Sequence, residues 1–189
     1  MEHPEIIARL KQGDRSAFTE IVEQCQHMIY NTALSIVQHD EDAEDITQDV
    51  FVTLYEKISG FREESALSTW LYRITVRKAL DHEKKKQRQK HGGFLQRIFS
   101  VRESEEPANF DHPGVVLDKK EQAAVLFSAI KKLPEKQRVA FTLHKMEGLS
   151  YQQIADIMEN SLFATESLLV RAKNNLKDIL QEYYEQQFK

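Results

Sequence analysis

The chain has 189 residues, of which 41% are hydrophobic and 30% are charged, and its formal net charge is −4. This length allows one large domain or two small ones, and the overall charge does not by itself favour a nucleic-acid-binding protein. A single cysteine, Cys25, excludes an internal disulfide. We see neither a signal peptide nor the run of about 18 apolar residues that a membrane span needs, so we expect a cytoplasmic protein without membrane insertion.

The N-terminal half predicts three helices. Asp14 can cap a long amphipathic helix, and Asp40 can cap a second one. Ser68 or Thr69 can begin a third, which continues to about Lys90. The second helix has apolar residues at helical spacing on one face, namely Ala43, Ile46, Val50 and Leu54.

Residues 91–113 have the composition of a linker, with two adjacent glycines, two prolines and an acidic run that oppose a packed core. Helical patterning returns from about Val115. Pro134 can be the first residue of the next helix, and Gly148 can cap its end. The chain is therefore predicted to be all-α, with two small helical domains joined by a flexible linker.

The C-terminal sequence has the spacing of a helix-turn-helix. Ser150 and Gln153 form a capping box that opens a short helix, and Asn160 can take the left-handed conformation in the turn that follows. One stripe of the last helix must pack inward: Leu162, Thr165, Leu169, Ala172 and Leu176. In such motifs the second helix meets base edges in the major groove, although spacing alone equally allows an ordinary helical hairpin.

Charge is distributed unevenly between neighbouring segments. Residues 1–61 have a net charge of −8, whereas residues 62–102 have a net charge of +7. Asp42, Asp45 and Asp49 share one face of the second helix, where like charges are mildly destabilising unless a basic partner offsets them. The alternative is a solvated acidic face without a partner.

The third helix combines cations with aromatic residues. Arg73, Arg77 and Lys84 lie on one stripe, close to Trp70 and Tyr72. Such a surface can hold backbone phosphates while aromatic rings stack on unpaired bases. The alternative is that Trp70 belongs to the core and that the cations are only solvated.

The sequence does not favour a metal site or an enzyme. Cys25 and His27 lack the further ligands that a metal needs, so Cys25 is expected to be a small core residue. We find neither a glycine-rich phosphate loop nor a nucleophile with its base. No cofactor is therefore expected.

Two motifs resemble conserved regions of the extracytoplasmic-function (ECF) sigma factors, members of the sigma-70 family of bacterial RNA polymerase. DAEDITQDVFVTLYEKI followed by SALSTWLYRITVRKALD is similar to region 2 of the family, and LPEKQRVAFTLHKMEGLSYQQIADIM with the helix after it is similar to region 4. The resemblance implies region 2 at residues 1–90, a linker at residues 91–113 and region 4 at residues 114–189. It covers nearly the whole chain.

The resemblance also implies partners and site residues. The clamp helices of the largest subunit of core polymerase would contact Asp42, Asp45, Gln48 and Asp49. The minus-ten element of the promoter would be recognised and melted by Arg62, Ser65, Ser68, Trp70, Tyr72, Arg73, Arg77 and Lys84. The minus-thirty-five duplex would be read by Arg138, Ser150, Tyr151, Gln152, Phe163, Glu166, Ser167, Arg171 and Lys173.

Region 4 would also rest on the polymerase flap, the linker would cross the active-site channel, and an anti-sigma factor would hold the protein inactive. Two residues depart from the family pattern: Glu166 stands where a basic residue is common, and Glu159 stands where a glycine is common. Two other classes remain as alternatives, a freestanding helix-turn-helix regulator that binds duplex DNA as a dimer and a helical adaptor without a nucleic-acid role.

Overall fold

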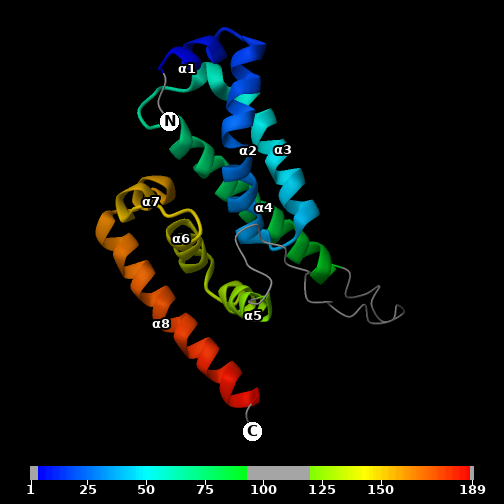
Figure 1. Cartoon of the computed structure of the whole chain (residues 1–189), viewed down its shortest axis with the longest axis vertical. Coiled ribbons are helices and arrows are strands. Elements are labelled where there is room, and N and C mark those ends of the chain that lie inside the picture. The colour runs from blue at the N-terminus through cyan, green and yellow to red at the C-terminus, as the bar shows by residue number, and fades with distance from the viewer. Residues whose placement is uncertain (1–3, 93–119, 188–189) are drawn as a thin grey trace.

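The computed structural model describes residues 4–92 and 120–187, and every regular element in these two ranges is a helix, as the sequence predicts. The N-terminal bundle consists of α1 (Pro4–Lys11), α2 (Arg15–Val37), α3 (Asp40–Lys57), the short 3₁₀ helix η1 (Ile58–Gly60) and α4 (Leu67–Gly92). The C-terminal bundle consists of α5 (Lys120–Lys131), α6 (Glu135–Lys145), α7 (Tyr151–Met158) and α8 (Leu162–Gln187) (Figure 1). Almost all of the predicted linker lies outside the described residues.

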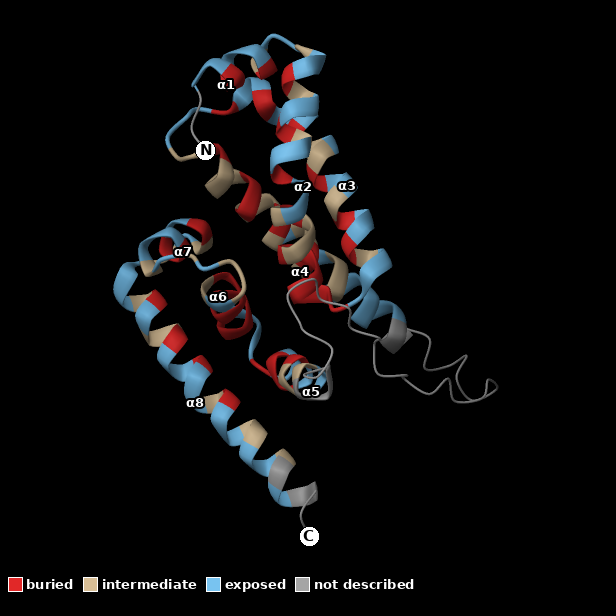
Figure 2. Cartoon of the chain, viewed as in Figure 1, coloured by how far each residue is buried: buried red, intermediate tan, exposed pale blue. Residues whose placement is uncertain are grey.

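Helices α2, α3 and α4 pack along one another and form the core of the N-terminal bundle. Their buried stripes face inward, while the outer faces are exposed (Figure 2). The largest side chains of this core are almost fully enclosed: Ile29, Leu34, Ile36, Val50, Leu54 and Leu71. Cys25 is 4% exposed, which confirms that it is a core residue.

The starts of the N-terminal helices follow from their capping residues. Asp14 is the N-cap of α2, as predicted, and its carboxylate accepts hydrogen bonds from the backbone of Ser16 and Ala17. Hydrogen bonds from the side chain of Arg9 and from Ser16 lower the pKa of Asp14 to about 2. The prediction for α3 is wrong by one residue, because His39 and not Asp40 is the N-cap.

Helix α4 begins at Leu67, one residue before the predicted start. In the C-terminal bundle, Pro134 is the N-cap of α6 and not its first residue. Both differences leave the predicted helices in place, because the boundary moves by a single position.

The C-terminal bundle contains the predicted helix-turn-helix, formed by α7, a short turn and α8. The capping box of Ser150 and Gln153 is present in full. The left-handed residue of the turn is Glu159, with φ 54°, and not Asn160. In α8, Thr165, Leu169, Ala172 and Leu176 are buried, but Leu162 is 43% exposed and does not belong to the inward stripe.

The two bundles pack against each other, with α4 on α7 and α2 on α6. Tyr72 of α4 is 7% exposed and belongs to the same apolar cluster as Val139, Leu143 and Ile154 of the C-terminal bundle. A second connection is the hydrogen bond from Nε2 of Gln38 to the carbonyl oxygen of Phe127, at 2.9 Å. We call these contacts, with the polar ones described below, the interdomain contact.

None of the helices in the described part of the chain is both long and apolar enough to cross a membrane.

Candidate nucleic-acid interface

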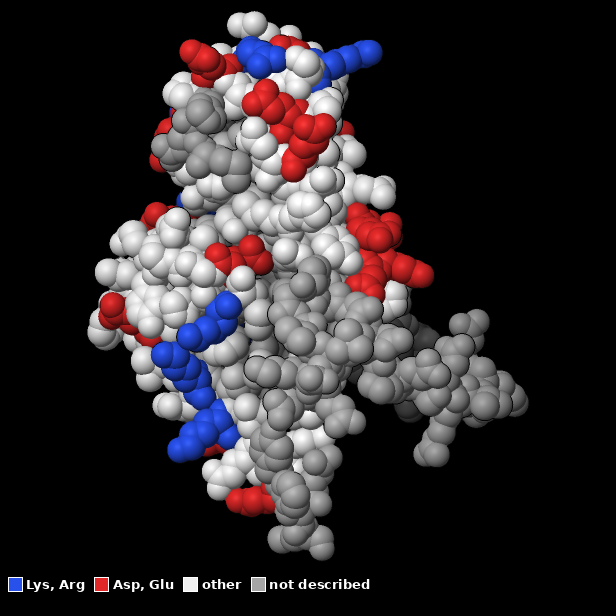
Figure 3. Space-filling model, in the orientation of Figure 1, with Lys and Arg blue, Asp and Glu red and all other residues white. Residues whose placement is uncertain are grey.

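Helix α3 presents the predicted acidic face. Asp45, Gln48 and Asp49 are exposed, and carboxylates gather over α3 in the space-filling view (Figure 3). Oδ2 of Asp49 lies 3.5 Å from Nζ of Lys78 on α4, but the side chain of Asp49 remains 69% exposed. These three residues are therefore free to meet a partner surface.

Asp42 lies in a different environment, although it belongs to the same predicted set. Its carboxylate is 2.7 Å from Nζ of Lys86 and 3.3 Å from Nε2 of His82, both on α4, and its side chain is only 17% exposed. Desolvation acts to raise the pKa of Asp42, but Lys86, His82 and His39 outweigh it and lower the pKa. The main contacts of Asp42 thus join α3 to α4 inside the chain.

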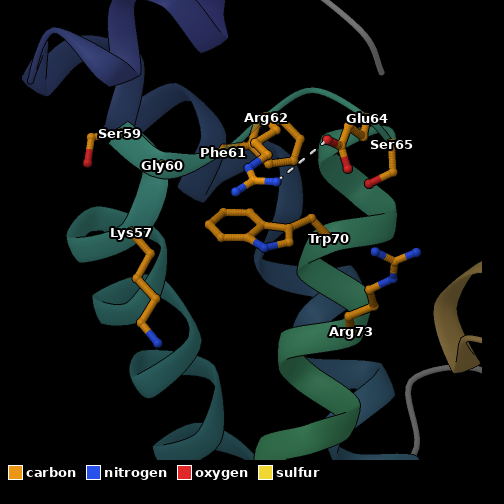
Figure 4. Close-up of a pocket in the computed structure, with 9 residues that line it drawn as sticks. All are labelled: Lys57, Ser59, Gly60, Phe61, Arg62, Glu64, Ser65, Trp70 and Arg73. Carbon is orange, nitrogen blue, oxygen red and sulfur yellow. Dashed lines mark ion pairs between the residues drawn. The ribbon is translucent and has the colours of Figure 1, made fainter.

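An open pocket lies between the end of α3 and the start of α4. It has a volume of about 640 Å³, and its wall includes four of the predicted minus-ten residues, Arg62, Ser65, Trp70 and Arg73. The indole of Trp70 lies across the pocket, with Phe61 and Arg62 on the neighbouring loop (Figure 4). An accessible ring beside cationic groups is the arrangement that unpaired bases require for stacking.

The residues that position this pocket were not predicted from the sequence. Phe61 packs on Trp70 with ring centroids 5.1 Å apart. Lys11 of α1 pairs with Glu63 of the loop and lies over the ring of Phe61. Glu63 adopts a positive φ of 59°. The loop is thus held by a cation that is 52 residues away in sequence, and a local pattern cannot reveal such a contact.

The aromatic and cationic residues further along α4 are divided between solvent and the C-terminal bundle. Arg77 is exposed, whereas Arg73 donates hydrogen bonds from Nε and Nη2 to the carbonyl oxygen of Asp156, at 3.0 and 2.7 Å. Lys84 pairs with Glu135 at 3.2 Å. Three predicted minus-ten residues, Tyr72, Arg73 and Lys84, therefore take part in the interdomain contact.

Tyr72 and Glu147 form a mostly buried polar pair within this contact. The hydroxyl of Tyr72 donates to Oε2 of Glu147 at 3.2 Å. Burial, together with the neighbouring carboxylate, raises the pKa of Tyr72. Burial also raises the pKa of Glu147, and hydrogen bonds from Tyr72 and Thr32 oppose that effect. Ionisation of Glu147 is therefore less favourable in this arrangement than in water.

Arg138 was predicted to bind the minus-thirty-five duplex, and the structure places its guanidinium in an ion pair with Glu83 of α4. The residue is only 8% exposed. Burial raises the pKa of Glu83, while the charge of Arg138 acts in the opposite direction. In this arrangement Arg138 holds the two bundles together and does not face solvent.

The other predicted minus-thirty-five residues lie at the helix-turn-helix. Phe163, Glu166, Arg171 and Lys173 are exposed on α8, and Ser167 is half-buried. On α7 the hydroxyl of Ser150 is used as the helix cap, Tyr151 packs edge-on against His144, and Gln152 donates to Asp156 at 3.0 Å. The exposed set on α8 is thus the accessible part of this prediction.

A groove separates α4 from the C-terminal bundle beside the interdomain contact. It has a volume of about 340 Å³. Its lining combines apolar side chains, among them Val76, Leu80, Val139 and Met158, with charged residues of both signs. The cations Arg73, Arg77 and Lys84 come from α4, as does Asp81, and Glu135 and Glu159 come from the C-terminal bundle. Within the described residues, no group of three or more His, Cys, Asp or Glu side chains is arranged to hold a metal ion.

Comparison with known families matches both bundles. Residues 21–89 match the family model for sigma-70 region 2, and residues 123–176 match that for sigma-70 region 4. The chain is 30% identical over 185 residues to the ECF RNA polymerase sigma-E factor of Haemophilus influenzae, covering 93% of this chain and 94% of that protein. It is 29% identical over 185 residues to the RNA polymerase sigma-H factor of Pseudomonas aeruginosa, covering 94% and 93%.

Two solved structures share the fold. CnrH, in complex with the cytosolic domain of CnrY, is similar with a TM-score of 0.67 and 21% identity, over 94% of this chain and 96% of CnrH. The sigma factor RpoE of Bartonella quintana, in complex with the anti-sigma factor NepR, is similar with a TM-score of 0.64 and 23% identity, over 87% and 96%. With both regions in the expected order on the predicted helices, the chain belongs to the ECF sigma factors of the sigma-70 family.

Proposed function

We propose that this sigma factor assigns polymerase binding and promoter opening to two different faces of its N-terminal bundle, and that core RNA polymerase supplies the chemistry. The proposal is supported by the separation of the acidic face on α3 from the Trp70 pocket at the start of α4. Its place of action is the cytoplasm, where polymerase and promoter DNA meet. The chain acts as a specificity subunit and not as an enzyme.

Asp45, Gln48 and Asp49 form the polymerase-binding part of α3. Exposed carboxylates on one helix face suit a basic partner, and polar contacts of this kind determine specificity and association rate. Asp42 contributes less, because Lys86 and His82 already neutralise it within the chain. This ranks four residues that the sequence alone treated alike.

The pocket around Trp70 receives a base of the melted minus-ten strand. An unpaired base costs a few kcal/mol to extract from the duplex, and stacking on an aromatic ring offsets about 1–3 kcal/mol of it. Arg62 and Arg73 line the same pocket, so that cations lie beside the ring to meet the backbone phosphates. The duplex minus-thirty-five element is bound by the exposed face of α8.

The interdomain contact must open before the promoter can be melted. It covers Tyr72, engages Arg73 and buries Arg138, all of which belong to the predicted DNA-binding set. The closed arrangement is therefore the inactive form of the chain, and binding to polymerase separates the bundles.

An anti-sigma factor would stabilise the closed form. Both structural relatives described above are complexes, one of them with an anti-sigma factor, and both resemble this chain over most of its length. The groove along α4 is lined by both apolar and charged side chains, a combination that fits an amphipathic helix.

The observation that carries the proposal is the partly buried ring of Trp70, which lines an open, cation-lined pocket of a region 2 bundle. Its test is transcription by sigma-free core polymerase supplemented with the full chain on genomic DNA, with mapping of the start sites. We expect initiation at a defined set of promoters. A chain that neither co-purifies with core nor directs initiation would contradict the proposal, and a freestanding regulator would instead bind duplex DNA as a dimer without polymerase.

A further inference from the structure

Phe163 is the most exposed large apolar side chain among the described residues, at 78%. It lies in the first turn of α8, directly after the turn of the helix-turn-helix. A phenylalanine side chain that stays in water forgoes the favourable free energy that its burial would give. Its position therefore needs a physical explanation.

No part of the C-terminal bundle can cover this ring. At about 100° per residue, Phe163 lies about 180° around α8 from Ala172 and about 160° from Thr165. Both of those residues are fully buried. The inward stripe of α8 thus fixes Phe163 on the opposite side, pointing away from the core.

The residues around Phe163 form a mixed face with separate apolar groups. Val170, which is 58% exposed, lies about 20° from Phe163 around the helix and about 10 Å further along its axis. Glu166 and Ser167 lie between them, and Arg171 flanks them with its Nε bonded to the carbonyl oxygen of Ser167 at 3.1 Å. We call Phe163, Glu166, Ser167 and Val170 the recognition face.

From this geometry we infer that Phe163 reads the 5-methyl group of a thymine in the minus-thirty-five duplex, an inference that rests on the function proposed above. The thymine methyl is the apolar group that a base pair presents in the major groove, and phenylalanine is one of the side chains that contact it. The N-terminal residues of the second helix are those that reach base edges. Phe163 has neither charge nor hydrogen-bonding groups, so it cannot serve as a phosphate contact.

The composition of the face favours DNA over a protein partner. Two apolar groups separated by polar residues do not form the contiguous patch that protein interfaces present. Glu166 is repelled by phosphates but can accept a hydrogen bond from the amino group of cytosine, so that it also belongs over base edges. The face therefore specifies bases, whereas Arg171 and Lys173 beside it are suited to hold the backbone.

Replacement of thymine by uracil removes only the methyl group and is the sharpest test. Holoenzyme assembled from core polymerase and the full chain first selects its preferred minus-thirty-five element from a duplex library randomised there. Each selected thymine is then replaced in turn by uracil, and holoenzyme affinity is measured. We expect a loss of about 3- to 10-fold at one position or two adjacent ones, which is the scale of one buried methyl group.

Three variants assign this loss to the ring. Phe163→Ala should select no thymine at that position and should bind the thymine and uracil duplexes equally. Phe163→Leu keeps an apolar side chain and should retain part of the discrimination. Leu162→Ala, which removes an exposed apolar side chain about 100° around the helix, should discriminate like the unaltered chain.

The possible outcomes separate this inference from the proposed function. A holoenzyme that initiates at promoters yet binds every uracil duplex as tightly as its thymine counterpart would overturn the role of Phe163 alone. Full discrimination by Phe163→Ala would do the same, as would a variant that loses a protein partner but no thymine preference. Absence of any promoter-directed initiation would instead contradict the proposed function.

Discussion

The guanidinium of Arg73 on α4 donates two hydrogen bonds to the carbonyl oxygen of Asp156, 83 residues further along the chain near the C-terminal end of α7. A cation at this place satisfies a terminal carbonyl and interacts favourably with the negative end of the helix. The same side chain lines the pocket of Trp70. In the proposed function Arg73 thus has two competing uses, one in the closed chain and one on promoter DNA.

Arg73→Ala should therefore open the free protein and weaken promoter melting at once. Loss of hydrogen bonds from a charged donor in a partly exposed setting should destabilise the closed arrangement by about 1 kcal/mol, equivalent to a roughly fivefold shift toward open molecules. Small-angle scattering or a pair of fluorophores on α3 and α8 measures this change. Arg77→Ala serves as the matched control, because Arg77 is exposed and one turn away; equal opening in both variants would contradict the assignment.

The buried carboxyl of Glu147 should make the closed arrangement sensitive to pH. Burial raises the pKa of Glu147, so the closed form binds more protons than the open form between the ordinary glutamate pKa and the raised value. The resulting stabilisation of the closed form is fully present below the ordinary pKa of a glutamate. It is lost as the pH rises through the raised pKa of Glu147. Glu83 has a pKa raised by burial too, and it contributes in the same direction.

The variant Glu147→Gln isolates the part of this pH dependence that is due to Glu147. The amide keeps a group that can accept from Tyr72 but cannot ionise, so this variant should stay closed at neutral pH and should lose part of the pH dependence. The measurement is the interdomain distance between pH 4 and 8. An unchanged pH profile would assign the effect to Glu83 instead.

Much of the fold was predictable from the sequence because helix starts and apolar stripes are local signals. The N-cap Asp14 and the capping box of Ser150 were correctly predicted. A short polar side chain just before a series of apolar residues at helical spacing is a reliable sign of a helix start. The errors were also local. His39 took the cap next to Asp40, and Glu159 took the left-handed position next to Asn160.

The interdomain contact could not be predicted, because its residue types have two equally good uses. Tyr72, Arg73 and Arg138 have the aromatic and cationic character of a nucleic-acid surface, and the same character suits polar contacts between helices. Only the packing of α4 on α7 and of α2 on α6 shows which use the closed chain makes of them. The predicted contacts of these three residues with promoter DNA concern the form in which the bundles are separated, and they remain predictions.

Because Glu159 has a left-handed backbone conformation, its replacement by glycine should stabilise the C-terminal bundle. A non-glycine residue in this conformation costs about 1–2 kcal/mol, while glycine loses about 0.5–1 kcal/mol more conformational freedom on folding. Glu159→Gly should therefore raise the free energy of unfolding of the C-terminal bundle by about 0.5–1 kcal/mol. Thermal unfolding measures this difference. Glu159→Gln removes the charge but keeps the side chain, and an equal gain in that variant would trace the effect to charge.

Polymerase binding and promoter opening should respond to different substitutions. Asp45→Lys reverses an exposed charge on α3 and should weaken binding to core polymerase by about 10-fold, an effect that grows at low salt. Trp70→Ala removes a stacking platform and should reduce open-complex formation by about 10- to 100-fold while core binding stays intact. Fluorescence titration with core and permanganate footprinting of the melted strand measure the two steps. Equal loss of core binding in both variants would contradict this division.

The carboxylate of Glu166 on the recognition face should limit how strongly region 4 binds duplex DNA. Glu166→Arg exchanges one repelled charge for one attracted charge close to the backbone, so holoenzyme affinity for duplexes of any sequence should rise at low salt. Each added phosphate contact steepens the slope of log affinity against log salt by about 0.9. A salt titration of Glu166→Arg beside Glu166→Gln separates the new attraction from the lost repulsion, since only the arginine can add a counterion-releasing contact. A slope that is the same in both variants would show that residue 166 lies too far from the phosphates to bind them, and would assign its side chain to the bases alone.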